Sequence, residues 1–178
     1  MLDSLKKELD AFRKRVVAQS KKNLKNKKST GNLANTIDSK LNFSKNSFEL
    51  SFDLGSYGEF VDKGVRGADP SRVKNGKQKA PKSPFRFGSG TGKKGGLNRS
   101  LDKWIVRKGI APRNAKGEFM SRQSLRFVLA RSIYSQGIKP SLFFTKPFEK
   151  EFKNLSDDVL KAFGLDVDEF LKYTLNGK

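Results

Sequence analysis

Residues 41–54, LNFSKNSFELSFDL, decide the fold class, because the spacing of apolar side chains changes there from a helical period to a strand period. Apolar residues occupy every second position on both sides of the polar turn SKNS at 44–47. Two alternating runs separated by turn chemistry predict an antiparallel hairpin with one buried face, which Gly55 ends.

Upstream of the hairpin, apolar residues repeat at steps of three and four, the spacing of one helix face. Asp3 and Ser4 can cap the start of this helix, and lysines gather near its expected end at Ser29. An amphipathic helix that packs on its own core is favoured over a helix that binds a partner. The repeating residues are Leu2, Leu5, Leu9, Phe12 and Val16.

Downstream, residues 57–64 predict a short helical turn closed by Gly64, and residues 65–96 lose their periodicity. A loop of about thirty residues is much longer than a usual connection, so it is functional, disordered or both. Helices are expected at 97–108, at 121–136 and at 148–163, where Gly164 acts as the C-cap, and a short helix follows from Asp166. Residues 140–147 carry two prolines and are expected to be extended.

These elements predict an α+β fold with a small antiparallel sheet and several helices. A length of 178 residues suits one compact domain with an appended arm. We expect an N-terminal helix at 1–30, a core domain at 31–155 with a basic loop insertion at 65–96, and a C-terminal helical extension at 156–178.

The positive charge is concentrated in the middle of the chain. Residues 63–131 hold nineteen Lys and Arg and three acids, an excess of +16 out of a total of +20, whereas residues 141–178 hold six basic and seven acidic residues. An excess this local needs a polyanion, an acidic partner surface or a crowded ring of neighbours to offset it.

Composition excludes several kinds of site. The chain has no Cys and no His, which rules out disulfides, Cys/His zinc sites, thiol nucleophiles and Ser-His-Asp triads. No apolar run approaches the roughly 18–20 residues that span a bilayer. Acids interrupt the first residues where a signal peptide would be apolar. We therefore expect a non-secretory setting, such as an assembled particle, and no membrane partner.

Two catalytic or cofactor interpretations are weak. Residues 90–95, GTGKKG, match the dinucleotide fingerprint as a string, but a proline-containing segment precedes them instead of a buried strand. Asp53, Glu59 and Asp62 lie close together in sequence and could hold magnesium in a nuclease, although solvated surface acids explain them without any chemistry. We expect no enzyme activity, no cofactor and no metal.

The basic residues of the central segment form two sets, either of which can bind phosphate backbones without reading sequence. Phe85 and Phe87 beside the first set could stack on bases or anchor the loop to a neighbouring subunit. The loop set, our candidate for DNA or partner contacts, is Arg66, Arg72, Lys74, Lys77, Lys79, Lys82, Arg86, Lys93 and Lys94. The helical set is Arg99, Lys103, Arg107, Lys108, Arg122, Arg126 and Arg131.

Two segments together resemble the tail-completion or neck proteins of tailed bacteriophages. Residues 57–64, YGEFVDKG, follow the hairpin, and residues 137–149, GIKPSLFFTKPFE, lead into a C-terminal helix. The segments WIVRKGI at 104–110 and ARSIYSQGI at 130–138 also look like those of a phage subgroup with a longer insertion. The positions that carry the resemblance are Tyr57, Phe60, Val61, Gly64, Trp104, Phe143, Phe144, Pro147 and Phe148.

The resemblance implies a small curved antiparallel sheet with packed helices, in a structural virion protein that forms a ring of twelve or six copies between portal and tail. Its partners would be the portal or an adjacent neck ring, tail proteins and double-stranded DNA in the channel. It would be located in the neck or tail region of the virion and assembled in the cytoplasm of the host bacterium. The alternative is a free-standing, sequence-nonspecific nucleic-acid-binding protein that uses residues 63–131.

Overall fold

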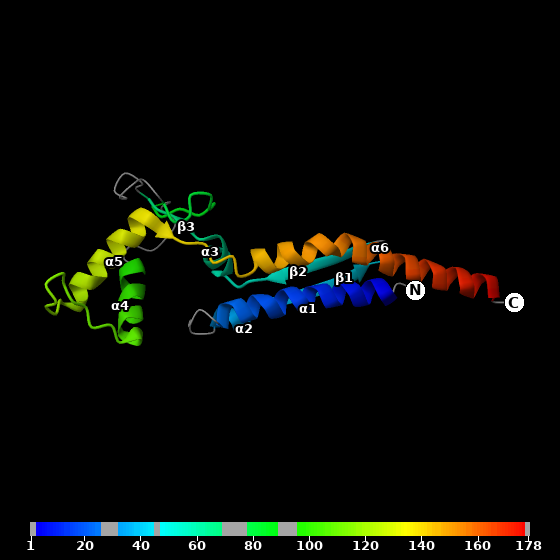
Figure 1. Ribbon diagram of the computed structural model, residues 1–178, viewed down its shortest axis with the longest axis horizontal. Coiled ribbons are helices and arrows are strands. Elements are labelled where there is room, and N and C mark those ends of the chain that lie inside the picture. Colours follow the sequence, from blue (N-terminus) through cyan, green and yellow to red (C-terminus); the bar gives the residue numbers. More distant parts are fainter. Residues whose placement is uncertain (1–2, 26–31, 45–46, 69–77, 89–95, 177–178) are drawn as a thin grey trace. The chain divides into compact units, whose positions relative to one another are not determined.

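The computed structural model describes residues 3–25, 32–44, 47–68, 78–88 and 96–176 (Figure 1). Its contacts divide the chain into two compact units, unit 1 (residues 1–62 and 142–178) and unit 2 (residues 63–141). The chain thus divides at 62/63 and 141/142, whereas we expected boundaries at 30/31 and 155/156. Unit 2 is inserted between two segments that together make unit 1.

The described residues combine helices with two small antiparallel sheets, so the predicted α+β class is confirmed. Unit 1 contains α1 (Asp3–Lys25), α2 (Asn32–Thr36), β1 (Asp38–Ser44), β2 (Ser47–Asp53), α3 (Gly58–Lys63, whose last residue begins unit 2) and α6 (Thr145–Asn176). Unit 2 contains β3 (Val65–Arg66), α4 (Gly96–Lys108), α5 (Arg122–Gln136) and β4 (Gly137–Ile138).

Helices α1 and α6 lie side by side and antiparallel (Figure 1). At one end the Asn23 side chain donates to the carbonyl of Phe143 (3.2 Å), and at the other Asp166 meets the first turn of α1. The stripe predicted for α1 is buried as far as the structure describes it, since Leu5, Leu9, Phe12 and Val16 all lie in the core; Leu2 lies outside the described residues. The apolar face of α1 therefore packs within its own chain.

The predicted hairpin pairing is also confirmed, but its apolar face is only partly covered, since Phe43 and Phe48 near the turn are exposed. Strands β1 and β2 pair with Leu41 opposite Leu50 and Phe43 opposite Phe48. Phe52 on this apolar face meets Phe12 of α1 at 6.4 Å between ring centroids and Phe148 of α6 at 5.9 Å, both edge-on. Edge-to-face rings of this kind add about 0.5–1.5 kcal/mol per pair beyond their buried area. The hairpin is thus fixed to both long helices through its aromatic side chains.

Helix α6 differs from the expectation in two places. The segment 140–147 was expected to be extended, but the helix begins at Thr145 and includes Pro147 in its first turn. Proline is tolerated there because the first N–H groups of a helix have no partner within the helix. A break at Gly164 was also expected, yet the helix continues through it. Buried Ala162 and Asp166 on either side hold this turn helical against the propensity of glycine.

Two aspartates cap the long helices from outside. The carboxylate of Asp62 in α3 accepts the backbone N–H of Phe144 (2.8 Å) and of Thr145 (3.3 Å), together with the Thr145 hydroxyl. Asp166 accepts the N–H groups of Ser4 and Leu5 at 3.0 Å each. Both carboxylates lie at helix N-termini, where unpaired donors and the helix dipole stabilise negative charge.

The pKa of Asp166 reflects this capping role. Burial raises the pKa of its carboxyl group, but the hydrogen bonds from Leu5 and Ser4 together outweigh burial, and the pKa lies below its ordinary value of 3.8. The carboxylate form is therefore the form that holds the start of α1.

The described part of the expected loop, residues 65–68 and 78–88, is held by backbone pairing, so of the two options the disordered one does not apply there. The N–H of Arg66 donates to Phe85 (2.8 Å), and the N–H of Phe87 donates back to Arg66 (3.0 Å). Strand β3 pairs with β4, and the Phe87 ring lies 6.1 Å from that of Tyr134 in α5. Backbone pairing over such a sequence separation has no local signal.

Helices α4 and α5 pack against each other within unit 2 and end as predicted. Ser121 caps α5 through a hydrogen bond from the N–H of Ser124 (3.1 Å), and Gly137 ends it with a φ of 83°. Gly109 follows α4 with a φ of 60°. Glycine adopts these positive values without the penalty that a Cβ atom would impose.

Candidate nucleic-acid and partner interface

The charge of the chain separates by structural unit. Unit 2 holds twenty Lys and Arg and three acids, a net charge of +17, whereas unit 1 holds eighteen Lys and Arg and fifteen acids, a net charge of +3. The basic segment found in the sequence, residues 63–131, thus nearly coincides with unit 2, residues 63–141. A unit with this charge attracts polyanions and repels copies of itself.

Of the nine loop residues proposed as contacts, four are described. The guanidinium of Arg86 donates to the carbonyl of Ala68 (3.0 Å). The backbone at Arg66 pairs with the backbone at Arg86 as an isolated parallel β-bridge. Lys79 and Lys82 are exposed. The other five lie outside the described residues, and so does the GTGKKG segment; these five are Arg72, Lys74, Lys77, Lys93 and Lys94.

The outward face of α4 presents the clearest row of cations, which we name the α4 stripe. Arg99, Lys103 and Arg107 follow one another at intervals of four residues and are all exposed. Side chains at this interval share one helix face and stand about 6 Å apart along the axis. Within the part of the chain that the structure describes, none of the three has an ion-pair partner.

Other arginines of unit 2 are engaged within that unit. Asp102 of α4 lies 3.1 Å from the Arg122 Nε and 3.6 Å from a guanidinium nitrogen of Arg126, both on α5. Arg113 donates to the carbonyl of Gly117 (2.7 Å) and lies 3.8 Å from the centre of the Phe119 ring. These three arginines stabilise unit 2 and are less available to a ligand than the α4 stripe.

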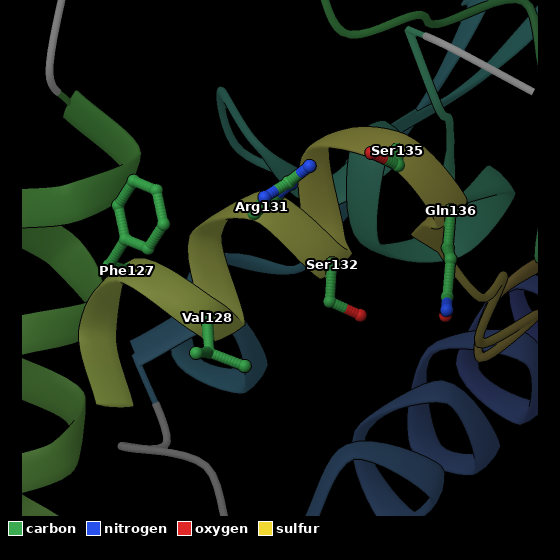
Figure 2. Close-up of a pocket in the computed structure, with 6 residues that line it drawn as sticks. All are labelled: Phe127, Val128, Arg131, Ser132, Ser135 and Gln136. Carbon is green, nitrogen blue, oxygen red and sulfur yellow. The ribbon is translucent and has the colours of Figure 1, made fainter. Parts of the chain in front are cut away.

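A shallow depression runs along α5. Figure 2 shows the six side chains that line it on successive turns of that helix. Phe127 and Val128 are strongly exposed, and Arg131 is the only charge among the six. An open, partly apolar surface with one cation suits contact with a macromolecule better than enclosure of a small substrate. The lining residues are Phe127, Val128, Arg131, Ser132, Ser135 and Gln136.

The residues behind the family resemblance divide between core and surface. Phe143 is buried in a cluster with Leu24, Leu33, Ala34 and Ile37, and Val61 and Phe144 pack against that cluster. Pro147 is buried, and Phe148 contacts the rings of Phe12 and Phe52. Tyr57, Phe60 and Trp104 are exposed. Gly64 has a φ of 72°, and a Cβ atom there would lie 2.5 Å from the carbonyl oxygen of Ile138.

The three acids considered for magnesium have separate surroundings. Asp62 is buried and holds the N-terminus of α6, while Asp53 is exposed and accepts the N–H of Gly55 (2.8 Å). Among the described residues, no three acids lie close enough together to hold a metal ion. Sequence reasoning missed the capping role of Asp62. The signal that could have indicated it is an acid immediately before the lysine and glycine that end a short helix.

Comparison with known proteins identifies no relative: no family model, no curated protein and no solved structure matches the chain. Among the described residues, no helix has the length and apolar character needed to cross a bilayer.

Proposed function

We propose that this protein is a structural subunit of the neck of a tailed bacteriophage, located in the virion and forming a ring of twelve or six copies between portal and tail. The observation that carries the proposal is the separation of a nearly neutral unit 1 from unit 2, which carries +17. A subunit of a DNA-conducting assembly needs one surface for neighbouring proteins and another for a polyanion. The order of the motifs from Tyr57 to Phe148 supports the same assignment.

In such a subunit, unit 1 contacts neighbouring copies and unit 2 contacts a polyanion or an acidic protein surface. Unit 1 has little charge to oppose contact between copies, and it exposes large apolar side chains on α6. Unit 2 presents its cations to DNA in the channel or to an acidic surface of the portal or an adjacent ring. Head-to-tail contacts close a ring when the rotation between subunits permits it.

Oligomer mass and particle images test the ring directly. We expect the purified chain, alone or mixed with portal and tail proteins, to form closed rings in negative-stain images. The rings should persist at about 1 M salt, where the Debye length is about 3 Å, because their contacts are mainly apolar. A protein that is monomeric at every salt concentration and binds neither portal nor tail protein contradicts the proposal.

The α4 stripe favours one second candidate, a sequence-nonspecific binder of double-stranded nucleic acid. The stripe holds three exposed cations spaced for phosphate contact, and the exposed ring of Trp104 lies about 60° outside their arc on the same helix. In this candidate the charge of unit 2 acts on free DNA and no ring is needed.

A charge-matched comparison tests this candidate. Replacing Arg99, Lys103 and Arg107 with Gln should reduce the slope of log K against log salt by about 3, since each phosphate contact contributes about 0.9 for B-DNA. The control replaces Lys7, Lys40 and Lys150, exposed lysines of unit 1, with Gln and changes the net charge equally. An equal loss of affinity in both variants would show that net charge alone attracts DNA.

A further inference from the structure

Helix α6 carries an apolar row that its own unit leaves uncovered, which we name the α6 stripe. It comprises Phe152, Leu160, Phe163, Val167 and Leu171, whose exposed fractions lie between 38% and 69%. At about 100° per residue, all five fall within about 100° of the helix circumference. Ala162 and Asp166, the buried residues of this part of α6, lie outside that arc. The row extends over about 28 Å at 1.5 Å per residue.

The apolar positions of the α6 stripe have nearly the same spacing in both directions along the helix. The midpoint between Leu160 and Phe163 is also the midpoint between Phe152 and Leu171. A second α6 running antiparallel would therefore place Leu160 against Phe163 and Phe152 against Leu171, each pair twice. Val167 would face Ser156, whose small side chain leaves room for it. Two-fold contacts require this kind of self-complementary surface.

The charges beside the stripe also fit a second copy. Residues 152–172 hold three lysines and five acids, and one of these acids, Asp166, is engaged with α1. In the antiparallel arrangement Lys153 lies within about 3 Å along the axis of Asp168 of the second copy, on the same flank. Lys150 and Lys172 come level beyond the apolar row, where solvent screens their repulsion.

The same charges disfavour other occupants. Helices that lie on membrane surfaces are rich in Lys and Arg on their polar face, but acids outnumber lysines here. Nucleic acid would meet those acids and no row of cations. Unit 2 of another copy would be attracted electrostatically, but its charge of +17 would also be brought close to the basic units of its neighbours.

We infer that two copies of this chain pair antiparallel through the α6 stripe. The contact closes after two copies, so it makes a paired species that exists apart from any ring and does not depend on the proposed function. Within a larger assembly, a different surface must supply the head-to-tail contact.

Placing charge in the stripe tests the pairing. The double variant Leu160→Glu, Phe163→Glu should weaken dimerisation about a hundredfold or more in sedimentation equilibrium, since it puts carboxylates at the centre of an apolar contact. The control is Leu165→Glu, because Leu165 is 63% exposed on the same helix but points away from the stripe. Far-UV circular dichroism should stay unchanged in both, since all three residues are exposed. A wild type that is monomeric, or a control that dissociates equally, overturns the inference.

Cysteine cross-linking tests the direction of pairing, and the chain has no Cys of its own. Antiparallel pairing predicts a disulfide when Leu160→Cys and Phe163→Cys proteins are mixed, and little disulfide within either variant alone. Parallel pairing predicts the reverse, which would overturn the inference. If wild-type rings are seen but the mixture forms no cross-link, the pairing is wrong while the proposed function stands. If the cross-link forms without rings, the opposite holds.

Discussion

At the scale of single residues, two aspartates stabilise the N-termini of helices that belong to other elements. Asp62 was a candidate magnesium ligand, and its carboxylate instead accepts three hydrogen bonds at the start of α6. Asp166 does the same for α1 from a position more than 160 residues away in sequence. Each long helix is thus fixed at its N-terminus by a residue from another element.

Replacing Asp62 with Ala should lower the free energy of unfolding by about 1–3 kcal/mol, because buried N–H donors at the start of α6 lose a charged acceptor. Urea denaturation followed by circular dichroism measures the loss. The control Asp53→Ala removes an exposed acid that bonds only locally to Gly55, and it should change stability by no more than about 0.5 kcal/mol. Equal effects would contradict the capping role.

The pKa of Asp166 predicts a pH dependence with a definite sign. Since the pKa is lower in the folded state than its ordinary value of 3.8, the carboxylate stabilises the fold above that value. This contribution is lost as the pH falls through the lower folded-state pKa. Asp166→Asn should therefore melt at a lower temperature than wild type at pH 7, and the difference should shrink below about pH 3.8. A difference that is constant with pH would refute this account.

At the scale of elements, continuity of α6 gives a prediction at Gly164. A Cβ atom there meets nothing within 4 Å and the residue lies inside a helix, so Gly164→Ala should stabilise the protein by roughly 0.5–1 kcal/mol. Gly109→Ala is the matched control, since it also has open space but a φ of 60°, and it should destabilise. If Gly164 ended the helix in a left-handed conformation, both changes would destabilise. Thermal melts distinguish the two cases.

Elements with a local signal were predictable from the sequence, and those that depend on distant contacts were not. The apolar repeat of α1, the alternation of the hairpin and the Ser121 cap are complete within short windows. The continuity of α6 through Gly164 depends on packing against α1, whereas Pro147 is accommodated because it lies in the first turn of the helix. Similarly, the sequence locates the charge in the segment that forms unit 2, but only the packing of α4 on α5 shows that Asp102 engages Arg122 and Arg126.

At the scale of the whole molecule, the two units should respond differently to salt. Unit 2 carries +17 around a small described core that includes Val65, Leu101 and Ile105, so repulsion within it lowers its stability. Its melting temperature should rise between about 0.01 M and about 1 M NaCl, as the Debye length falls from about 30 Å to about 3 Å.

Fluorescence can follow this effect in unit 2 alone, because Trp104 is the only tryptophan of the chain and lies in α4. Unit 1, with a charge of +3, should show little change, measured as the calorimetric melting transition that Trp104 fluorescence does not follow. A tryptophan signal that is insensitive to salt would mean that bound counter-ions or internal ion pairs already offset the repulsion.

The chain leaves unit 1 after Asp62 and returns to it at Leu142, where the Leu142 N–H donates to the Asp62 carbonyl at 3.0 Å. Leu142 adopts a φ of 51°, which marks a sharp turn of the backbone at the point of return. Because the insertion starts and ends at one hydrogen-bonded point, its length and sequence can change without moving the two segments of unit 1 apart. Unit 2 can therefore be shortened, changed in charge or replaced, while the residues that determine the fold of unit 1 stay the same.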